Sequence, residues 1–410
     1  MHRIGTITIF LIAAMVFALG ACDTVVEEKK DGSKPEEVAD PDPPTYIKTM
    51  EAVAVGDRVY RFERGLWTEQ EIDESYLPLR SVAFVNPNLG FAGGQGVVLK
   101  YRDGLWQPET VAIPPHLMVK RMIASPMTGD VWAIAVSEDG TDSRILHRGP
   151  SGAWEAPSTM LEVFGAPDVE PLDVIFLQDD SGIGLLGRQD KDAIFHWRKM
   201  NGEGENLIYA YDPDSWRTFE CLGRTPEGNL AAGGYLNRNL NNQGFVRFLD
   251  INKLLSEDNS GDPKDFLLYD FSVPMAECPE ETVNQIIALP EDGVSYVVGR
   301  CSRDEIYMYQ AGVFEKIDLP GTRGPDYDIA GADFIDRYTG WAVGYQDEKD
   351  RTLFLLRDAN GWQSVIPVDA DNAPLIADGN GEHLYAVDVW EGPEQTVDGR
   401  TRDEVEAGVE

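Results

Sequence analysis

Two stretches far apart in the chain repeat the same order of residue types. Residues 340–362 read GWAVGYQDEKDRTLFLLRDANGW, and residues 90–106 read GFAGGQGVVLKYRDGLW. Each begins with Gly and an aromatic residue and passes through small residues to a second Gly. Each then crosses a polar turn, forms an apolar run ending in Arg-Asp, and closes on Trp. Such a copied unit indicates equivalent pieces of structure that share one core.

The small-residue part of this unit occurs eight times, at spacings of 38 to 65 residues. A second apolar run follows most copies, Gly and an aromatic residue close many units, and a run such as SVAFVN at 81–86 precedes many. The copies are VAVG 53–56, FAGG 91–94, WAIA 132–135, GLLG 184–187, AAGG 231–234, YVVG 296–299, WAVG 341–344 and YAVD 385–388. Four strands in a period in the forties are typical of propeller blades rather than of a solenoid.

We therefore predict an all-β chain that folds over 46–390 as a seven-bladed β-propeller, with eight blades as the alternative. The first unit, 51–71, lacks a preceding strand, and the last, 373–388, lacks the two strands that should follow. Strands from both termini would complete one blade, close the ring and remove free sheet edges. We expect the small-residue strands near the axis, where the blades crowd together. The aromatic residues of the closing strands should pack between blades, among them Trp67, Trp106, Trp154 and Trp362.

The first 45 residues have a different composition from the rest. Residues 1–21 combine a short basic start, an apolar run at 4–18 and the tripeptide LGA, and Cys22 follows. This is the pattern of a secretion signal, and its end resembles the bacterial lipobox, in which the cysteine receives lipid and becomes the first mature residue. An ordinary signal peptide and an uncleaved membrane anchor are the alternatives.

We accordingly predict a lipoprotein signal peptide over 1–21 and a lipid anchor on Cys22. Residues 22–45, charged and rich in Pro with little to bury, should form a flexible acidic tether, and 391–410 an acidic disordered tail. Acyl chains hold a protein on a membrane without help from its surface charge. The expected location is the bacterial cell envelope, as a membrane lipoprotein that faces the periplasm or the outside.

Export would also expose the remaining cysteines, Cys221, Cys278 and Cys301, to an oxidising compartment. Cys278 precedes the apolar run 283–289, and Cys301 follows the run 294–299. If the two runs form a hairpin, both cysteines lie at its open end, so we predict a Cys278–Cys301 disulfide. Cys221 would then be a buried free thiol.

Charge and motifs exclude several functions. The chain carries 71 acidic against 35 basic residues, a net charge of −36, which argues against nucleic-acid binding. Histidines are few and scattered, no CxxC pair occurs, and neither a GxSxG nor a phosphate-binding loop is present. We expect no catalytic, cofactor-binding or metal-binding residues and no cofactor.

Units such as 332–362 and 81–106 resemble the repeats of the photosystem II stability/assembly factor type of propeller and, more distantly, sialidase-type Asp-box repeats. In that family a GWAVG-like strand is paired with an Asp-Gly-Gly turn before Trp; here YRDGLW is one residue short and RDANGW is altered. The resemblance implies a seven-bladed, generally non-enzymatic propeller, and its assembly role implies protein binding.

These observations predict a lipid-anchored, monomeric β-propeller that acts as a non-enzymatic protein- or glycan-binding or assembly module. Its partner would be an envelope protein or a glycan, because rigid loops on one face of a propeller suit recognition. The alternative is a glycan hydrolase or lyase that uses a site at the channel mouth. A cluster of Arg, Tyr and carboxylate side chains at one end of the channel would favour the enzyme.

Overall fold

The computed structural model separates the chain into two compact units, Met1–Pro44 and Thr45–Glu410. The residues that it describes all belong to the second unit. They are 46–47, 49–159, 162–163, 169–176, 182–189, 192–199, 209–210, 217–238, 241–250, 267–272, 282–300, 304–320, 327–368, 374–376, 381–392 and 395–396.

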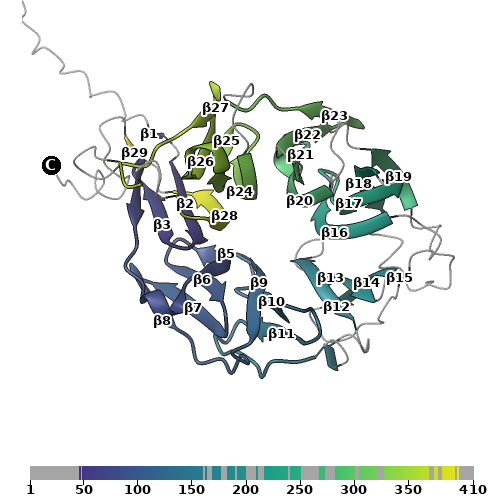
Figure 1. Ribbon diagram of the computed structural model, residues 1–410, viewed down its shortest axis with the longest axis horizontal. Helices are drawn as coiled ribbons and strands as arrows, with labels where there is room; N and C mark the ends of the chain where they lie inside the picture. Colours follow the sequence, from purple (N-terminus) through teal and green to yellow (C-terminus); the bar gives the residue numbers. More distant parts are fainter. Residues whose placement is uncertain are drawn as a thin grey trace, which may run out of the picture. The chain divides into compact units, whose positions relative to one another are not determined.

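Nearly all of these residues form antiparallel sheets that surround a central axis (Figure 1). Six sheets have four strands and one has three. From the axis outwards, the sheets that begin the chain are β28 (Leu384–Glu391), β2 (Met50–Gly56), β3 (Val59–Glu63) and β4 (Leu66–Glu69); β5 (Leu79–Asn86), β6 (Leu89–Gly94), β7 (Val97–Arg102) and β8 (Leu105–Pro108); and β9 (Leu117–Ala124), β10 (Val131–Ser137) and β11 (Ser143–Arg148). The prediction of an all-β propeller is confirmed.

The remaining sheets continue the same order. They are β12 (Glu170–Phe176), β13 (Gly182–Gln189), β14 (Asp192–Lys199) and β15 (Tyr209–Ala210); β16 (Arg217–Arg224), β17 (Leu230–Arg238), β18 (Asn241–Leu249) and β19 (Leu267–Ser272); β20 (Thr282–Leu289), β21 (Val294–Arg300), β22 (Glu305–Gln310) and β23 (Val313–Lys316); and β24 (Tyr327–Asp336), β25 (Thr339–Gln346), β26 (Arg351–Asp358) and β27 (Gly361–Ser364). Single 3₁₀ turns occur at Glu74–Tyr76, Pro290–Asp292 and Asp347–Lys349.

Side chains on the innermost strands fasten each sheet to the next. Ser81 on β5 donates its hydroxyl to the carbonyl of Val119 on β9, at 3.0 Å. Gln285 on β20 exchanges two hydrogen bonds with the backbone of Ala332 on β24. Equivalent contacts between neighbouring innermost strands are Asp173–Leu222, Cys221–Val283, Asp333–Val389 and Asp388–Phe84. Because these bonds saturate backbone groups between separate sheets, they keep the innermost strands in register around the axis.

Every innermost strand also contains a β-bulge at the equivalent place. In β24, for example, Ile329 pairs with Gly344 and Gly331 with Val343, which leaves Ala330 unpaired against β25. The unpaired residues of the innermost strands are Arg80, Lys120, Leu172, Glu220, Asn284, Ala330 and Tyr385. A bulge turns the extra side chain out of the ladder, so each strand contributes one side chain to the channel.

The bulge explains why the small-residue motif ends in Gly in most copies. A Cβ on Gly344 would lie 1.8 Å from the carbonyl oxygen of Asp328, and one on Gly234 would lie 1.9 Å from that of Thr218. Both glycines face the first residue of a bulge on the adjacent innermost strand. The bulge brings the two backbones too close for any side chain at this point.

The small-residue strands do not lie at the axis, contrary to expectation. Seven of the eight motifs lie in the second strands of their sheets; the exception is YAVD at 385–388, which lies in the innermost strand β28. The innermost strands are otherwise the runs that precede the small-residue motifs in sequence and that contain polar residues. A second strand is covered on both faces, as the fully buried stretch Ala52–Val55 on β2 shows. An innermost strand instead presents its bulge side chain to the open channel, where polar residues remain hydrated.

The expected packing of the tryptophans holds most clearly at Trp67. This residue of β4 is 2% exposed and packs its ring at 5.0 Å from that of Trp341 on β25, in the preceding sheet. Trp154 packs against Phe91 of another sheet at 5.7 Å. Trp106 is only half-buried, and its ring contacts Phe84 and Tyr101 of its own sheet.

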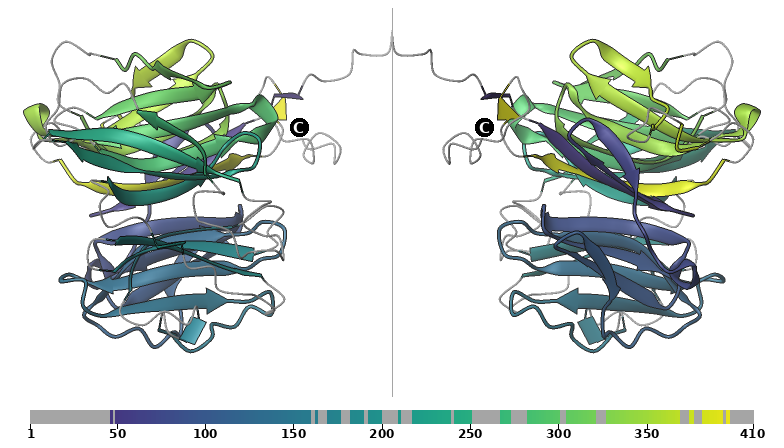
Figure 2. Two further views of the ribbon diagram at one scale, coloured as in Figure 1. Left: turned by 90° about the vertical axis from the view of Figure 1, so that its right-hand side faces the viewer. Right: turned by 90° about the vertical axis from the view of Figure 1, so that its left-hand side faces the viewer.

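Segments from the two ends of the described chain pair with each other. β1 (Tyr46–Ile47) pairs with β29 (Gln395–Thr396), and Gly392 donates its amide to the carbonyl of Thr49. β28 ends at Glu391, opposite Met50, so this pair lies beside the last residues of β28. Figure 2 turns the ring edge-on and shows the pair at one flat face. Residues 395–396, expected within a disordered tail, therefore form part of a strand pair.

Candidate functional site

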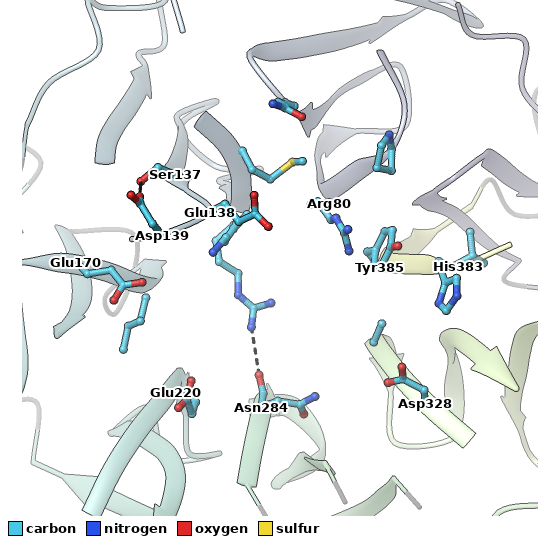
Figure 3. Close-up of a pocket in the computed structure, with 18 of the residues that line it drawn as sticks. Arg80, Ser137, Glu138, Asp139, Glu170, Glu220, Asn284, Asp328, His383 and Tyr385 are labelled. Atoms are coloured by element: carbon cyan, nitrogen blue, oxygen red, sulfur yellow. Dashed lines mark hydrogen bonds between the residues drawn. The ribbon is translucent and has the colours of Figure 1, made fainter. Parts of the chain in front are cut away.

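A cavity of about 1260 Å³ lies on the axis, where the innermost strands begin. The bulge residues of all the innermost strands line it, and the turn after β10 adds Ser137, Glu138 and Asp139 (Figure 3). The cavity is larger than a typical small-molecule site and is lined by charged and aromatic side chains from many sheets. We call it the channel pocket.

One arginine crosses the channel pocket. Arg121 follows the bulge of β9, and its Nη2 donates to the carbonyl oxygen of Asn284 on β20 at 3.2 Å, the bond drawn in Figure 3. Its Nε lies 3.6 Å from Oδ1 of Asp173 on β12. Arg121 thus ties three separate innermost strands together and places a guanidinium inside the channel.

Flat side chains stack along one wall of the pocket. The guanidinium carbon of Arg80 lies 3.4 Å from the ring centroid of Tyr385, and the rings of His383 and Tyr345 stack at 4.0 Å and 18°. His383 and Tyr385 are nearly parallel, with centroids 6.2 Å apart. Figure 3 shows Arg80, Tyr385 and His383 on the same side. Burial raises the pKa of Tyr385, although the nearby Arg80 lowers it. The cation–π contact holds the guanidinium of Arg80 in place over the ring of Tyr385.

The opposite wall is acidic. Figure 3 places Glu138, Asp139, Glu170 and Glu220 on the side facing Arg80 and Tyr385. Arg188 compensates Glu170, with 3.1 Å between Nε and Oε2. Burial raises the pKa of Glu220; Arg188 works against this shift and Glu170 adds to it. Hydrogen bonds from Ser137 and Thr141 lower the pKa of Asp139 to about 2, so this carboxylate stays ionised.

The pocket has groups suited to holding a charged ligand, and two histidines, His116 and His383, also line it. His116 lies 2.9 Å from Asp142, and His383 is sandwiched in the stack of rings. Within the described residues no group of three or more His, Cys, Asp or Glu side chains is placed to bind a metal ion. No helix among them is both apolar and long enough to cross a membrane.

None of the residues that line the pocket was predicted from the sequence as a site. Cys22, Cys278 and Cys301 are outside the described residues, so lipidation and the disulfide stay predictions. Cys221 is fully buried on β16 as a free thiol, and burial raises the pKa of this thiol well above its usual value.

The channel residues were not predicted from the sequence, although the repeated small-residue motif contains a signal for their positions. In six of the eight small-residue motifs, the last Gly or Ala pairs at or beside the bulge, and the bulge residue precedes it by 14 or 15 positions. Arg80 and Gly94 on β5 and β6 are one instance. The repeated Gly thus identified a close backbone approach, and reading it as a bulge would have identified the channel side chains.

Comparisons with known proteins support the fold and no more. The sequence matches no protein-family model and no curated protein. A crystal structure of a protein from Lactobacillus plantarum is 10% identical, covers 84% of this chain and 100% of its own, and has a TM-score of 0.53. Two proteins from Bacteroides uniformis and Bacteroides fragilis, each named a candidate 6-phosphogluconolactonase, are 11% identical. They cover 84% of this chain and 99% and 98% of their own, with TM-scores of 0.48 and 0.49, too low to bear on function.

Proposed function

We propose that this chain is a lipid-anchored, non-enzymatic binding module of the bacterial envelope, and that the channel pocket is its binding site. The observation that carries the proposal is the ring of bulges. Each innermost strand breaks its ladder at the equivalent position and sends one side chain into the same cavity. A core that only needed to be stable would not need charged side chains such as Arg80, Lys120 and Glu220 on its axis.

The proposal includes a ring of seven blades closed by strands from both ends. The sheet β28-β2-β3-β4 joins the start and the end of the chain, which supports the closure. The three-stranded sheet counts as the seventh blade, because isolated bridges from β11 to Trp154 and Ser158 follow the path of a fourth strand.

The position of the chain ends suits an anchored binding module. Tyr46, the first described residue, pairs beside the end of β28, whereas the pocket residues Leu384 and Tyr385 lie at its beginning. The first described strand therefore lies at the end of β28 that is farther from the pocket.

Two experiments test these parts separately. Cys22→Ala should move the protein from the membrane to the soluble fraction; membrane association that persists contradicts the anchor. A photo-reactive amino acid at Leu172, in the channel, should capture an envelope component in cells. The same amino acid at Leu105, 63% exposed on the outermost strand β8, should capture none of it. Equal capture at both positions, or none at Leu172, rejects the channel pocket as the binding site.

A second candidate function is the glycan hydrolase or lyase. Its support is the gathering of Arg, Tyr and carboxylate side chains at one end of the channel, including Arg80, Tyr385 and Glu220. A carboxyl group with a raised pKa, such as that of Glu220, suits a general acid. The raised pKa of Tyr385 makes its hydroxyl a poorer nucleophile. Turnover of envelope glycans that Glu220→Gln abolishes would establish the enzyme; a glycan screen without turnover supports the binding module.

A further inference from the structure

Opposite arcs of the channel pocket carry opposite charge. Following the innermost strands around the axis from β28, the bulge residues are Tyr385, Arg80, Lys120, Leu172, Glu220, Asn284 and Ala330. The two cations are neighbours in this order, and the only bulge carboxylate, Glu220, lies about half-way around the ring from Arg80. Figure 3 shows Arg80 and Glu220 on opposite sides of the cavity.

We propose that the channel pocket binds a short zwitterionic peptide, with its carboxylate at Arg80, Lys120 and Arg121 and its ammonium group at Glu220. This inference rests on the proposed function, since it names the ligand class of the same site. It goes further by fixing the charge at each end of the ligand and the direction in which the ligand lies.

The cationic arc, formed by Arg80, Lys120 and Arg121, carries more positive than negative charge. Within the described part of the chain, neither Arg80 nor Lys120 has a carboxylate partner at ion-pair distance, and Lys120 is exposed to the channel. Arg121 uses Nη2 on the carbonyl of Asn284 and Nε near Asp173. Among the described carboxylates, only Asp173 lies at ion-pair distance from any of these three cations, although the chain carries a net charge of −36. Arginine in a fixed plane, as Arg80 is against Tyr385, suits a carboxylate.

The acidic arc, which contains Glu220, would bind the other end of the ligand, its ammonium group. Glu220, on β16, is partly buried in the pocket wall. Burial is the main cause of the raised pKa of Glu220; Arg188 works against it, and the neighbouring Glu170 adds to it. A ligand ammonium would add positive charge beside Glu220. A polyanion would meet repulsion on this arc, and a polycation on the other, so a ligand with one charge of each sign fits both.

Size limits the ligand to a few residues. A cube of the cavity's 1260 Å³ has an edge of about 11 Å. An extended chain spans at most about 3.3–3.6 Å per residue, so three residues reach about 10–11 Å. A tripeptide therefore places its two charged ends against the two arcs without folding back.

The test uses the full-length protein in detergent and calorimetric titration with trialanine, N-acetyl-trialanine and trialanine amide. Only trialanine carries both end charges. We expect its dissociation constant to be at least about tenfold lower than that of either blocked peptide, with affinity falling as salt rises. No binding of trialanine, or equal binding of all three peptides, overturns the inference.

Two variants, each of which replaces a charged side chain by a neutral one, test the direction in which the peptide lies. Arg80→Gln should weaken trialanine and N-acetyl-trialanine, which keep the carboxylate, and leave trialanine amide unchanged. Glu220→Gln should weaken trialanine and trialanine amide, and leave N-acetyl-trialanine unchanged. Arg102→Gln, at a side chain 72% exposed on the outer hairpin, is the matched control and should change nothing. The opposite pattern, or losses independent of the blocked end, refutes the assignment. Unchanged melting temperatures show that the variants fold.

Failure of the inference is distinguishable from failure of the proposed function. If trialanine does not bind but the photo-reactive group at Leu172 still captures an envelope component, the ligand class is wrong and the site stands. Binding of trigalacturonate in place of trialanine has the same meaning and moves the ligand to acidic glycans. Loss of both peptide binding and capture removes the site itself.

Discussion

Two aspartates meet beside the strand that joins the ends of the chain. Asp333 on β24 accepts a hydrogen bond from the amide of Val389, and Asp388 on β28 accepts one from the amide of Phe84 at 2.6 Å. The two carboxyl groups also bond to each other. Burial raises the pKa of Asp333 to about 6, and burial together with the charge of Asp333 raises the pKa of Asp388 well above its usual value.

This pair predicts a pH-dependent stability with a definite sign. Both folded-state pKa values are raised, so the stabilisation is complete below the usual value of 3.8 and is lost as pH rises through about 6. For Asp333 the shift is about 2 pKa units, which corresponds to roughly 3 kcal/mol. Both side chains keep partial solvent exposure, so we expect about 1–3 kcal/mol at pH 8.

Asp388→Asn should recover this free energy. The amide oxygen can accept from Phe84, and the amide nitrogen can donate to Asp333 at every pH. The variant should therefore unfold at higher denaturant concentration than the parent at pH 8, and the difference should vanish near pH 4. Chemical unfolding at half-unit steps between pH 4 and 8 measures this difference.

The matched control removes one negative charge at an exposed turn. Asp103, with a side chain 78% exposed, can be changed to Asn without touching the pair. Asp103→Asn should show no comparable dependence on pH. A destabilisation by Asp388→Asn that is the same from pH 4 to 8 would refute the reasoning, because it would mean that only a hydrogen bond was lost.

Three further predictions concern the ring. Trp67→Ala should lower the free energy of unfolding by about 3–5 kcal/mol, because it removes an almost fully buried ring between two sheets; denaturant titration measures it, and an unchanged midpoint contradicts this packing. Gly344→Ala should lower the melting temperature strongly, because its Cβ would lie 1.8 Å from the carbonyl oxygen of Asp328. Gly149→Ala is the control and should be tolerated, because the atom nearest to its Cβ would lie at 3.8 Å. Equal melting temperatures of the two variants would argue against the bulge. Ser81→Ala should cost about 1–3 kcal/mol by leaving a buried carbonyl without its donor; a loss well under 1 kcal/mol in the same titration would mean that this contact does not fasten the ring.

The repeated unit predicted the class of fold correctly, but it did not reveal the order of strands within a sheet. The period and the alternation of apolar runs predicted an all-β propeller, because strand formation depends on local pattern and on the turns between runs. The order of strands within a sheet was less accessible. Small residues were expected at the axis, yet strands such as Ala52–Val55 in β2 lie second, since burial on both faces favours small residues as much as crowding does.

The sequence by itself determined the class of fold, the unit length and the acidic character of the chain. It also contained the repeated Gly at the end of the small-residue motif. Gly344 is one of these glycines, and it faces a bulge on the adjacent strand. Only the tertiary structure decided which side chains meet in the channel. Arg80 and Tyr385 are separated by almost the whole propeller in sequence and come within 3.4 Å because β28 returns to lie beside β2, next to β5. Contacts of this kind depend on pairing between strands that are far apart in the sequence, which local sequence patterns do not specify.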